Sequence, residues 1–244
     1  MKIIYQPKGR ALEYSPLACN QYMGCTHGCK YCYAQGCMRT SSLKWMSNVY
    51  IRKDVLENFE KDARKIENSS KRILFSFLSD PYQPIEKEHH ITRKCLELVA
   101  KYNLQSSILT KGSRDLIEQD FDLYHKARTQ LGITISFSKD ETRQQWEPNA
   151  STIHDRLELL KEAHKDGIYT WVSLEPVIDP KEALEVLHAA HPYVSFWKIG
   201  KLNHNKTIEK QVDWKRFLLS AKTFLNEVHA KYYIKKDLAK LEQM

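Results

Sequence analysis

The sequence predicts an α/β fold in which one parallel sheet is flanked by helices. Two observations carry this prediction: short apolar runs alternate with longer amphipathic stretches about six times, and polar residues directly follow several of the apolar runs. Parallel strands with right-handed helical crossovers either curl into a full or partial β/α barrel or stay open as a doubly wound sheet. In both arrangements ligands bind at the carboxyl ends of the strands, so the polar residues there are candidate site residues.

The alternation begins with two strand and helix pairs. Residues 73–78 form a nearly continuous apolar run, typical of a strand buried on both faces, and residues 90–102 have the spacing of an amphipathic helix. Residues 106–110 and 115–130 repeat the pair.

Further strands and helices complete the series. Residues 132–137 are strand-like, and the helix at 151–166 is expected to begin at a Ser151 cap and to end at Gly167. The remaining elements are a strand at 169–174, a helix at 181–190, a strand at 194–199 and a closing amphipathic helix at 213–229.

The composition is that of an ordinary globular protein. The chain has 244 residues, of which 42% are hydrophobic, and no Gly-, Ser- or Pro-rich linker interrupts it. We therefore expect a single domain over residues 1–244, with a core of about 14–200 and a C-terminal extension of about 201–244. The net charge of +8 and pI of about 9.0 permit a nucleic-acid partner, although spread basic residues are more often a solvated surface.

No part of the sequence indicates a membrane or secretory protein. No run approaches the ~18 apolar residues that a membrane span needs, and no long apolar stretch follows the charged start. We expect a cytoplasmic protein without membrane contact. Six cysteines in such a protein point to metal or redox chemistry rather than to a disulfide scaffold.

Three cysteines have the spacing of an iron-sulfur site. Cys25, Cys29 and Cys32 form a C-x3-C-x2-C pattern, and Gly24 and Gly28 allow the backbone to fold closely around a cluster. A 4Fe-4S cluster with three cysteine ligands keeps one iron open for a further ligand, as a catalytic metal site does.

Two other interpretations of the cysteines remain open. A zinc-stabilised nucleic-acid-binding module would take His27 as a fourth ligand, although its place inside the loop makes joint ligation awkward. An iron-sulfur redox carrier would need no open iron. Both leave the polar residues after the strands unexplained.

The cysteine pattern followed by Tyr33 resembles the signature of the radical S-adenosylmethionine (SAM) superfamily. The wider match, over about residues 14–180, resembles the branch related to spore photoproduct lyase. The stretches that carry it are 22–25, 79–84 with the sequence SDPYQP, Thr110-Lys111, and 156–158. The resemblance implies a partial (β/α)6 TIM-like barrel, a 4Fe-4S cluster, and reductive cleavage of SAM to a 5′-deoxyadenosyl radical. That radical would abstract hydrogen from an unidentified substrate, and a reductant such as flavodoxin or ferredoxin would supply the electron.

The resemblance also implies roles for individual residues. It makes Cys25, Cys29 and Cys32 the cluster ligands, Tyr31 a contact of the adenine, Ser79 a partner of the SAM amino group, Lys111 and Arg156 partners of its carboxylate, and Ser136 a partner of the ribose. A ribose diol and an ammonium group also need acceptors, and Glu175 after a predicted strand could serve as one or be a surface carboxylate.

The reaction is less defined than the cofactors. Photoproduct lyases have a hydrogen-donating cysteine immediately before the serine that aligns with Ser79, and here that position is Leu78, so thymine-dimer repair by that route is not expected. Tyr33 could pass a hydrogen atom or simply pack over the cluster. Lys198, Lys201, Asn203 and His204 could form a substrate pocket at the end of a strand, or only a polar turn.

Overall fold

The computed structural model describes residues 2–203 and 205–242. Its main sheet has seven strands in the order β1-β4-β5-β6-β7-β8-β9, and each neighbouring pair is parallel. The strands are β1 (Leu17–Cys19), β4 (Arg72–Phe75), β5 (Gln105–Thr110), β6 (Gln130–Thr134), β7 (Thr170–Val177), β8 (Phe196–Lys201) and β9 (Tyr232–Ile234). A separate antiparallel pair joins β2 (Tyr22–Met23) to β3 (Tyr50–Ile51).

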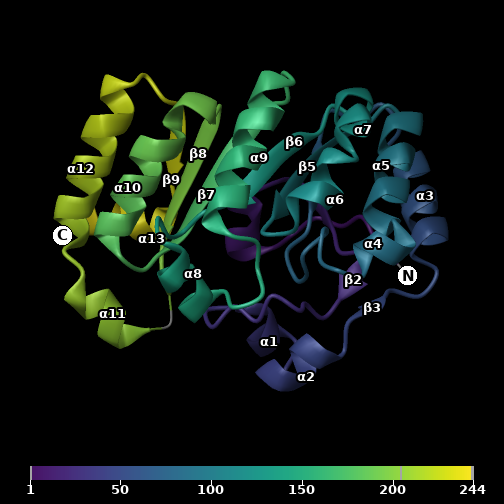
Figure 1. The fold of residues 1–244 in the computed structure, drawn as a ribbon. Coiled ribbons are helices and arrows are strands. Elements are labelled where there is room, and N and C mark those ends of the chain that lie inside the picture. The colour runs from purple at the N-terminus through teal and green to yellow at the C-terminus, as the bar shows by residue number, and fades with distance from the viewer. Residues whose placement is uncertain (1, 204, 243–244) are drawn as a thin grey trace.

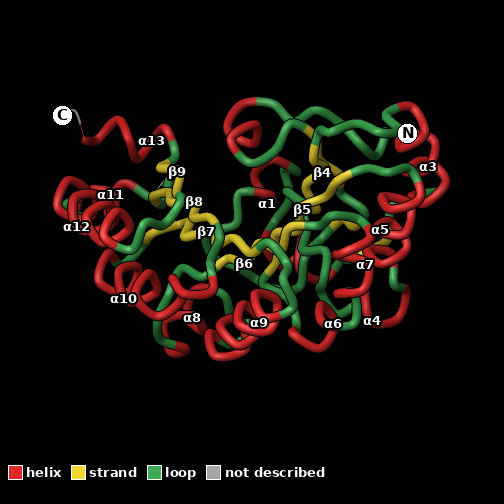
Figure 2. Tube along the Cα trace, turned by 90° about the horizontal axis from the view of Figure 1, so that it is seen from above, coloured by secondary structure: helices red, strands yellow, loops and turns green. Residues whose placement is uncertain are grey.

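The sheet is a partial barrel. Its strands follow one another in chain order from β4 to β9, whereas a doubly wound sheet would reverse direction at a switch point. Figure 2 shows the strands on a curved arc, with the helices on its convex side. The predicted α/β class and barrel-like curvature are therefore confirmed, and the sheet is not closed.

Most helices lie on the outside of the arc, whereas α1 and α2 lie beyond the ends of the strands (Figures 1 and 2). In chain order, the helices of the described residues are α1 (Ala34–Cys37), α2 (Ser42–Ser47), α3 (Val55–Lys65), α4 (Glu86–His89), α5 (Ile91–Lys101), α6 (Arg114–Glu118), α7 (Phe121–Lys126), α8 (Asp140–Trp146), α9 (Ile153–Lys165), α10 (Pro180–Ala190), α11 (Lys206–Gln211), α12 (Trp214–Glu227) and α13 (Lys236–Ala239). Short 3-10 turns occupy Gly9–Glu13, His191–Tyr193 and Lys240–Glu242. No helix in the described part of the chain is both long and apolar enough to span a membrane.

Two predicted helices differ in detail from the structure. The helix expected at 115–130 is divided into α6 and α7 around Asp120, whose buried carboxylate accepts hydrogen bonds from the Tyr82 hydroxyl (2.8 Å) and from Arg93 (2.8 Å). Helix α9 is capped by Thr152, whose side chain accepts from the Asp155 amide, rather than by Ser151. The predicted stop at Gly167 holds, because its φ of 76° lies in the left-handed region that favours glycine.

The five predicted strands are present with shifted ends. The first stops at Phe75, and residues 76–79 turn away from the sheet instead of extending it. Strands β1 and β9 were not predicted. Because β9 pairs with β8, part of the expected C-terminal extension belongs to the sheet.

Candidate metal and cofactor site

The cysteine loop lies at the carboxyl end of the sheet. Its backbone is tied to neighbouring helices, because the Cys25 amide donates to the Trp45 carbonyl (3.2 Å) and the Lys30 amide to the Trp146 carbonyl (2.9 Å). Figure 1 shows α1 and α2, which follow the loop, beyond the ends of the strands that feed α8 and α9. The predicted cysteines therefore stand where parallel sheets bind their ligands.

Gly24 is required for the close approach of this loop to α2. It has a φ of 78°, and a Cβ atom there would collide with the Asn48 carbonyl oxygen. A side chain at this position would thus push the loop off the helix.

Two of the loop cysteines, Cys25 and Cys29, are poor thiolates without a metal. Burial raises the pKa of Cys25 to about 12 and that of Cys29 to about 11. A bound metal favours the thiolate form and removes this penalty. The donor set therefore fits a metal group better than free thiol chemistry.

The geometry does not favour a single zinc ion. Across residues 2–203 and 205–242, no three Cys, His, Asp or Glu side chains converge on one possible ion position. The His27 Nδ1 atom lies 3.5 Å from the Asp80 carboxylate, so this proposed fourth ligand already has a partner. A 4Fe-4S cluster spreads its irons over a cube, and its three thiolates do not need to meet at one point.

Basic groups gather beside Cys29. Burial lowers the pKa of Lys111, but Cys29 and Glu147 outweigh this effect and leave the pKa raised, so the ammonium stays charged. Its Nζ atom lies 5.7 Å from the centroid of the Tyr31 ring. Arg156, like Lys111, lowers the pKa of Cys29, so the structure brings Cys29, Tyr31, Lys111 and Arg156 close together.

Arg156 is a buried cation with unused hydrogen-bonding capacity. Its side chain is 1% exposed, and its Nη1 atom lies 2.7 Å from Glu147 and donates to the Thr134 carbonyl (3.0 Å). Its Nη2 atom is buried and has no hydrogen-bond partner within the described residues. An unpartnered guanidinium nitrogen beside a lysine and a cluster cysteine fits the carboxylate of an amino-acid-like cofactor.

Glu147 is a site residue that the sequence analysis missed. Its fully buried carboxylate accepts a hydrogen bond from the Tyr31 hydroxyl and pairs with Arg156. Burial raises the pKa of Glu147, but Arg156 and Lys111 outweigh burial and leave it lowered. No local motif marks this residue, because its partner Tyr31 is 116 positions away in the sequence.

The two predicted serines differ in their surroundings. The Ser79 hydroxyl donates to the Gly24 carbonyl (2.8 Å) and accepts from Gln83 (2.6 Å), which places it against the cysteine loop. The Ser136 hydroxyl is fully buried and has no hydrogen-bond partner among the described residues. Ser136, which follows β6, is thus a second buried polar group without a hydrogen-bond partner in the described part of the chain, in addition to the Arg156 Nη2 atom.

Glu175 and Tyr33 have hydrogen-bond partners other than Lys111 and Arg156. Glu175 lies in β7, and its carboxylate accepts a hydrogen bond from the Tyr14 hydroxyl. Both of its carboxylate oxygens also accept hydrogen bonds from the Lys235 Nζ atom, each at 2.9 Å. It is therefore not a simple surface carboxylate. Tyr33 is 54% exposed and donates to the Phe77 carbonyl (2.6 Å).

The lysines predicted for a substrate pocket are engaged within the chain. Lys198 donates to the carbonyls of Glu13 (3.0 Å) and Tyr14 (2.8 Å), and Lys201 pairs with Glu209 (3.0 Å). Asn203 donates to the Lys201 carbonyl, as expected for a polar turn, and His204 lies outside the described residues.

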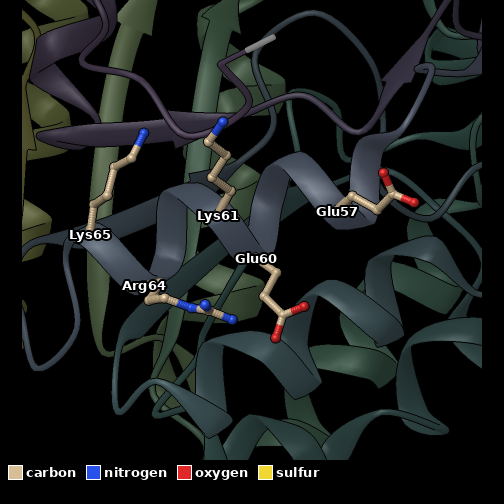
Figure 3. A pocket seen from close by; sticks show the side chains of 5 residues that line it. All are labelled: Glu57, Glu60, Lys61, Arg64 and Lys65. Atoms are coloured by element: carbon tan, nitrogen blue, oxygen red, sulfur yellow. The ribbon is translucent and has the colours of Figure 1, made fainter.

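Two surface hollows lie away from the cysteine loop. The first, of about 380 Å³, is formed by charged side chains of α3, and Figure 3 shows these side chains fanning out rather than converging. The second, of about 420 Å³, is lined by residues near the amino ends of the strands, including Arg72, Gln130 and Trp171. Neither contains a predicted cofactor residue.

A Radical SAM superfamily model matches residues 20–191 of the chain. An uncharacterised protein of Methanocaldococcus jannaschii is 32% identical over 187 residues, which are 75% of this chain and 69% of that protein. A Radical SAM Nalpha-GlyT isomerase of Pseudomonas phage M6 is 24% identical over 162 residues, which are 63% of this chain and 31% of that protein. Uncharacterised mycobacterial relatives are 24% identical, and the matched part is 52% of their length.

Solved structures agree with the fold. A spore photoproduct lyase mutant superposes with a TM-score of 0.74 at 14% identity, covering 96% of this chain and 79% of that one. Streptococcus suis SuiB bound to S-adenosylmethionine gives a TM-score of 0.66 at 9% identity, with coverages of 89% and 49%. At such low identities these likenesses concern the fold alone.

Proposed function

Since the chain belongs to the radical SAM superfamily, we propose that it is an enzyme that cleaves SAM reductively and abstracts a hydrogen atom from a substrate. The cofactors of this family are a 4Fe-4S cluster and SAM. The observation that carries the proposal is a pair of cations beside Cys29, the half-buried Lys111 and the buried Arg156. This pair would supply the charge that the carboxylate of SAM requires, beside one of the three cysteines that would hold the cluster.

The residues of the site divide the work of holding the two cofactors. Cys25, Cys29 and Cys32 would hold the cluster, and when bound, the cluster and SAM supply a 5′-deoxyadenosyl radical. Lys111 and the free Nη2 atom of Arg156 would bind the SAM carboxylate.

The remaining contacts complete the SAM site. Ser79 would accept from the SAM amino group, and Ser136, whose hydroxyl has no partner in the described part of the chain, would bond the ribose. Tyr31 would contact the adenine while its hydroxyl stays on Glu147. Glu175, held by Tyr14 and Lys235, would be a further hydrogen-bond acceptor for SAM.

Tyr33 is the proposed residue for hydrogen-atom delivery. Its ring is more than half exposed, and the position equivalent to the lyase cysteine is Leu78, which has no transferable hydrogen on a heteroatom. If Tyr33→Phe still cleaves SAM to 5′-deoxyadenosine but no longer forms the product of the substrate, this role is supported.

The test of the proposed function is the formation of 5′-deoxyadenosine. Protein reconstituted anaerobically with iron and sulfide is reduced with dithionite in the presence of SAM. We expect 5′-deoxyadenosine from the wild type and from Cys95→Ala, whose buried thiol belongs to α5 and not to the loop, and none from Cys29→Ala. Colourless protein that carries zinc, or a cluster that leaves SAM intact, would overturn the proposal.

The charge of the molecule favours a nucleic acid as the substrate class. A net charge of +8 attracts polyanions, and binding through phosphate contacts weakens steeply with added salt. We expect single- or double-stranded oligonucleotides to bind at low salt and to stimulate consumption of SAM. Salt-independent binding, or no stimulation by any oligonucleotide, would argue for a peptide or a small metabolite instead. The free cysteines suit the reducing cytoplasm, where we propose that the protein works.

A further inference from the structure

The segment that carries the cysteine loop is unusually basic. Residues 14–53 contain no Asp or Glu, and their basic residues are Lys30, Arg39, Lys44, Arg52 and Lys53. This segment therefore contributes five of the net +8 charges of the chain, while the remainder is close to balanced. Such a local field attracts acidic partners to this side of the molecule.

The same segment exposes large apolar side chains. Leu43 is 77% exposed and Met38 is 40% exposed, and they alternate along the chain with the exposed Arg39 and Lys44. We call these four residues the α1–α2 face. Figure 1 shows α1 and α2 at the lower edge of the molecule, away from the helices that cover the sheet. Exposed apolar residues that stand close together in a basic segment of the chain favour an interaction surface.

Helix α2 connects this face directly to the cysteine loop. The Trp45 carbonyl accepts from the Cys25 amide, and the Met46 side chain lies within 2.8 Å of the position that a Cβ of Gly28 would take. Residues 43 and 44 thus precede the very residues that touch the loop. A partner seated on Leu43 and Lys44 would be separated from the cysteines by a single helix.

We propose that the α1–α2 face is the docking site of a small acidic protein that carries one low-potential electron at a time. The inference rests on the proposed function, because reductive cleavage of SAM consumes one electron. In the docked complex one electron leaves the carrier, which is oxidised, and reduces the cluster, and no atom is exchanged. The apolar Leu43 and Met38 favour a protein over a nucleic acid, since nucleic-acid interfaces are more polar than protein interfaces.

The test compares variants of this face with a matched pair on α12. Leu43→Ser and Lys44→Glu alter the α1–α2 face, while Leu219→Ser (70% exposed in the wild type) and Lys215→Glu make the same changes on a distant helix. The measurement is the anaerobic rate at which reduced flavodoxin, the probe carrier, bleaches the cluster absorbance at low salt. We expect each variant of the α1–α2 face to lower this rate about fivefold or more below saturation, and the α12 variants to stay within about twofold.

A small chemical reductant separates docking from catalysis. With dithionite, all four variants should form 5′-deoxyadenosine at the wild-type rate, because dithionite needs no docking surface. Equal flavodoxin rates in all four variants would overturn the docking proposal and leave the proposed function intact. Failure of the wild type with dithionite would instead overturn the proposed function.

Nucleic-acid binding gives the remaining outcome. If Lys44→Glu weakens the binding of an oligonucleotide but leaves reduction by flavodoxin unchanged, the α1–α2 face serves the substrate and the docking proposal is wrong. Reduction by flavodoxin that slows with added salt in the wild type, and less so in Lys44→Glu, would support it.

Discussion

At the scale of single residues, the ion pair between Glu147 and Arg156 is the interaction of the site that depends most on the presence of both partners. Both side chains are almost fully buried, and their charged atoms are 2.7 Å apart. Such a pair recovers its desolvation cost only when both partners are present. Glu147 therefore holds the Arg156 guanidinium in place, and Arg156 in turn offers its free Nη2 atom to a ligand.

Removal of Glu147 should destabilise the fold strongly. We expect Glu147→Ala to lower the free energy of unfolding by about 3 kcal/mol, because it leaves a buried guanidinium without its counter-charge. Glu162→Ala, which removes an exposed partner of Lys165, should cost no more than about 0.5 kcal/mol. Urea unfolding of the anaerobic proteins measures both values, and similar losses in the two variants would contradict the role of Glu147.

Lys198 should make stability depend on pH in the alkaline range. Burial and the neighbouring Lys235 lower the pKa of Lys198 to about 8, so between this value and about 10.5 the unfolded chain holds a proton that the folded chain has lost. The unfolded state then binds more protons, and stability contributed by this group rises with pH. Relative to Lys198→Met, the unfolding free energy of the wild type should therefore rise between pH 7 and pH 9.5, by at most about 2 kcal/mol. A constant difference across this range would show that Lys198 titrates normally.

The residues that sequence could identify are those with local signals. The cysteine spacing lies within eight positions, and the resemblance carried Lys111 and Arg156 with it. Glu147 and Lys235 had no such signal, because their partners Tyr31 and Glu175 lie 116 and 60 positions away. Only the fold brings these pairs together, so local sequence patterns could not predict that these residues interact.

At the scale of elements, the long regular segments were predictable and the short ones were not. The apolar patterns are long enough to predict strands β5 to β8 and helices α5, α9, α10 and α12 from the sequence. Strands β1 and β9 have three residues each, which is too few for a hydrophobic periodicity to be detected in the sequence. The break between α6 and α7 depends on the buried contacts of Asp120, and these contacts are tertiary.

Gly132 should be essential to the packing of β6 against β7. A Cβ atom at this position would collide with the Trp171 indole ring and would lie 2.6 Å from the Ile108 carbonyl oxygen. We expect Gly132→Ala to lower the free energy of unfolding by at least about 2 kcal/mol, because neither the backbone nor the buried ring can move freely. Gly36→Ala, where a Cβ atom meets nothing within 4 Å, should be neutral or slightly stabilising. Thermal unfolding of the two variants measures the contrast, and a tolerated alanine at 132 would contradict the close packing.

At the scale of the whole molecule, the sequence alone left the closure of the sheet open. Alternating strands and helices predict a parallel sheet, but they do not distinguish a barrel from a doubly wound sheet. The resemblance to a known family selected the partial barrel, and the chain-ordered strands from β4 to β9 agree with it. This curvature brings the ends of β5 and β6 to the cysteine loop, so that Lys111 and Arg156 reach the same place as Cys29.

The proposed function requires SAM to bind an open iron beside Lys111 and Arg156. Electron paramagnetic resonance of the dithionite-reduced, reconstituted protein tests this most directly. We predict that SAM changes the spectrum of the wild-type cluster, and that Lys111→Met needs about tenfold more SAM for the same change while it binds the same amount of iron. If saturating SAM leaves the spectrum of the wild-type cluster unchanged, SAM does not bind the cluster and the proposed function is wrong.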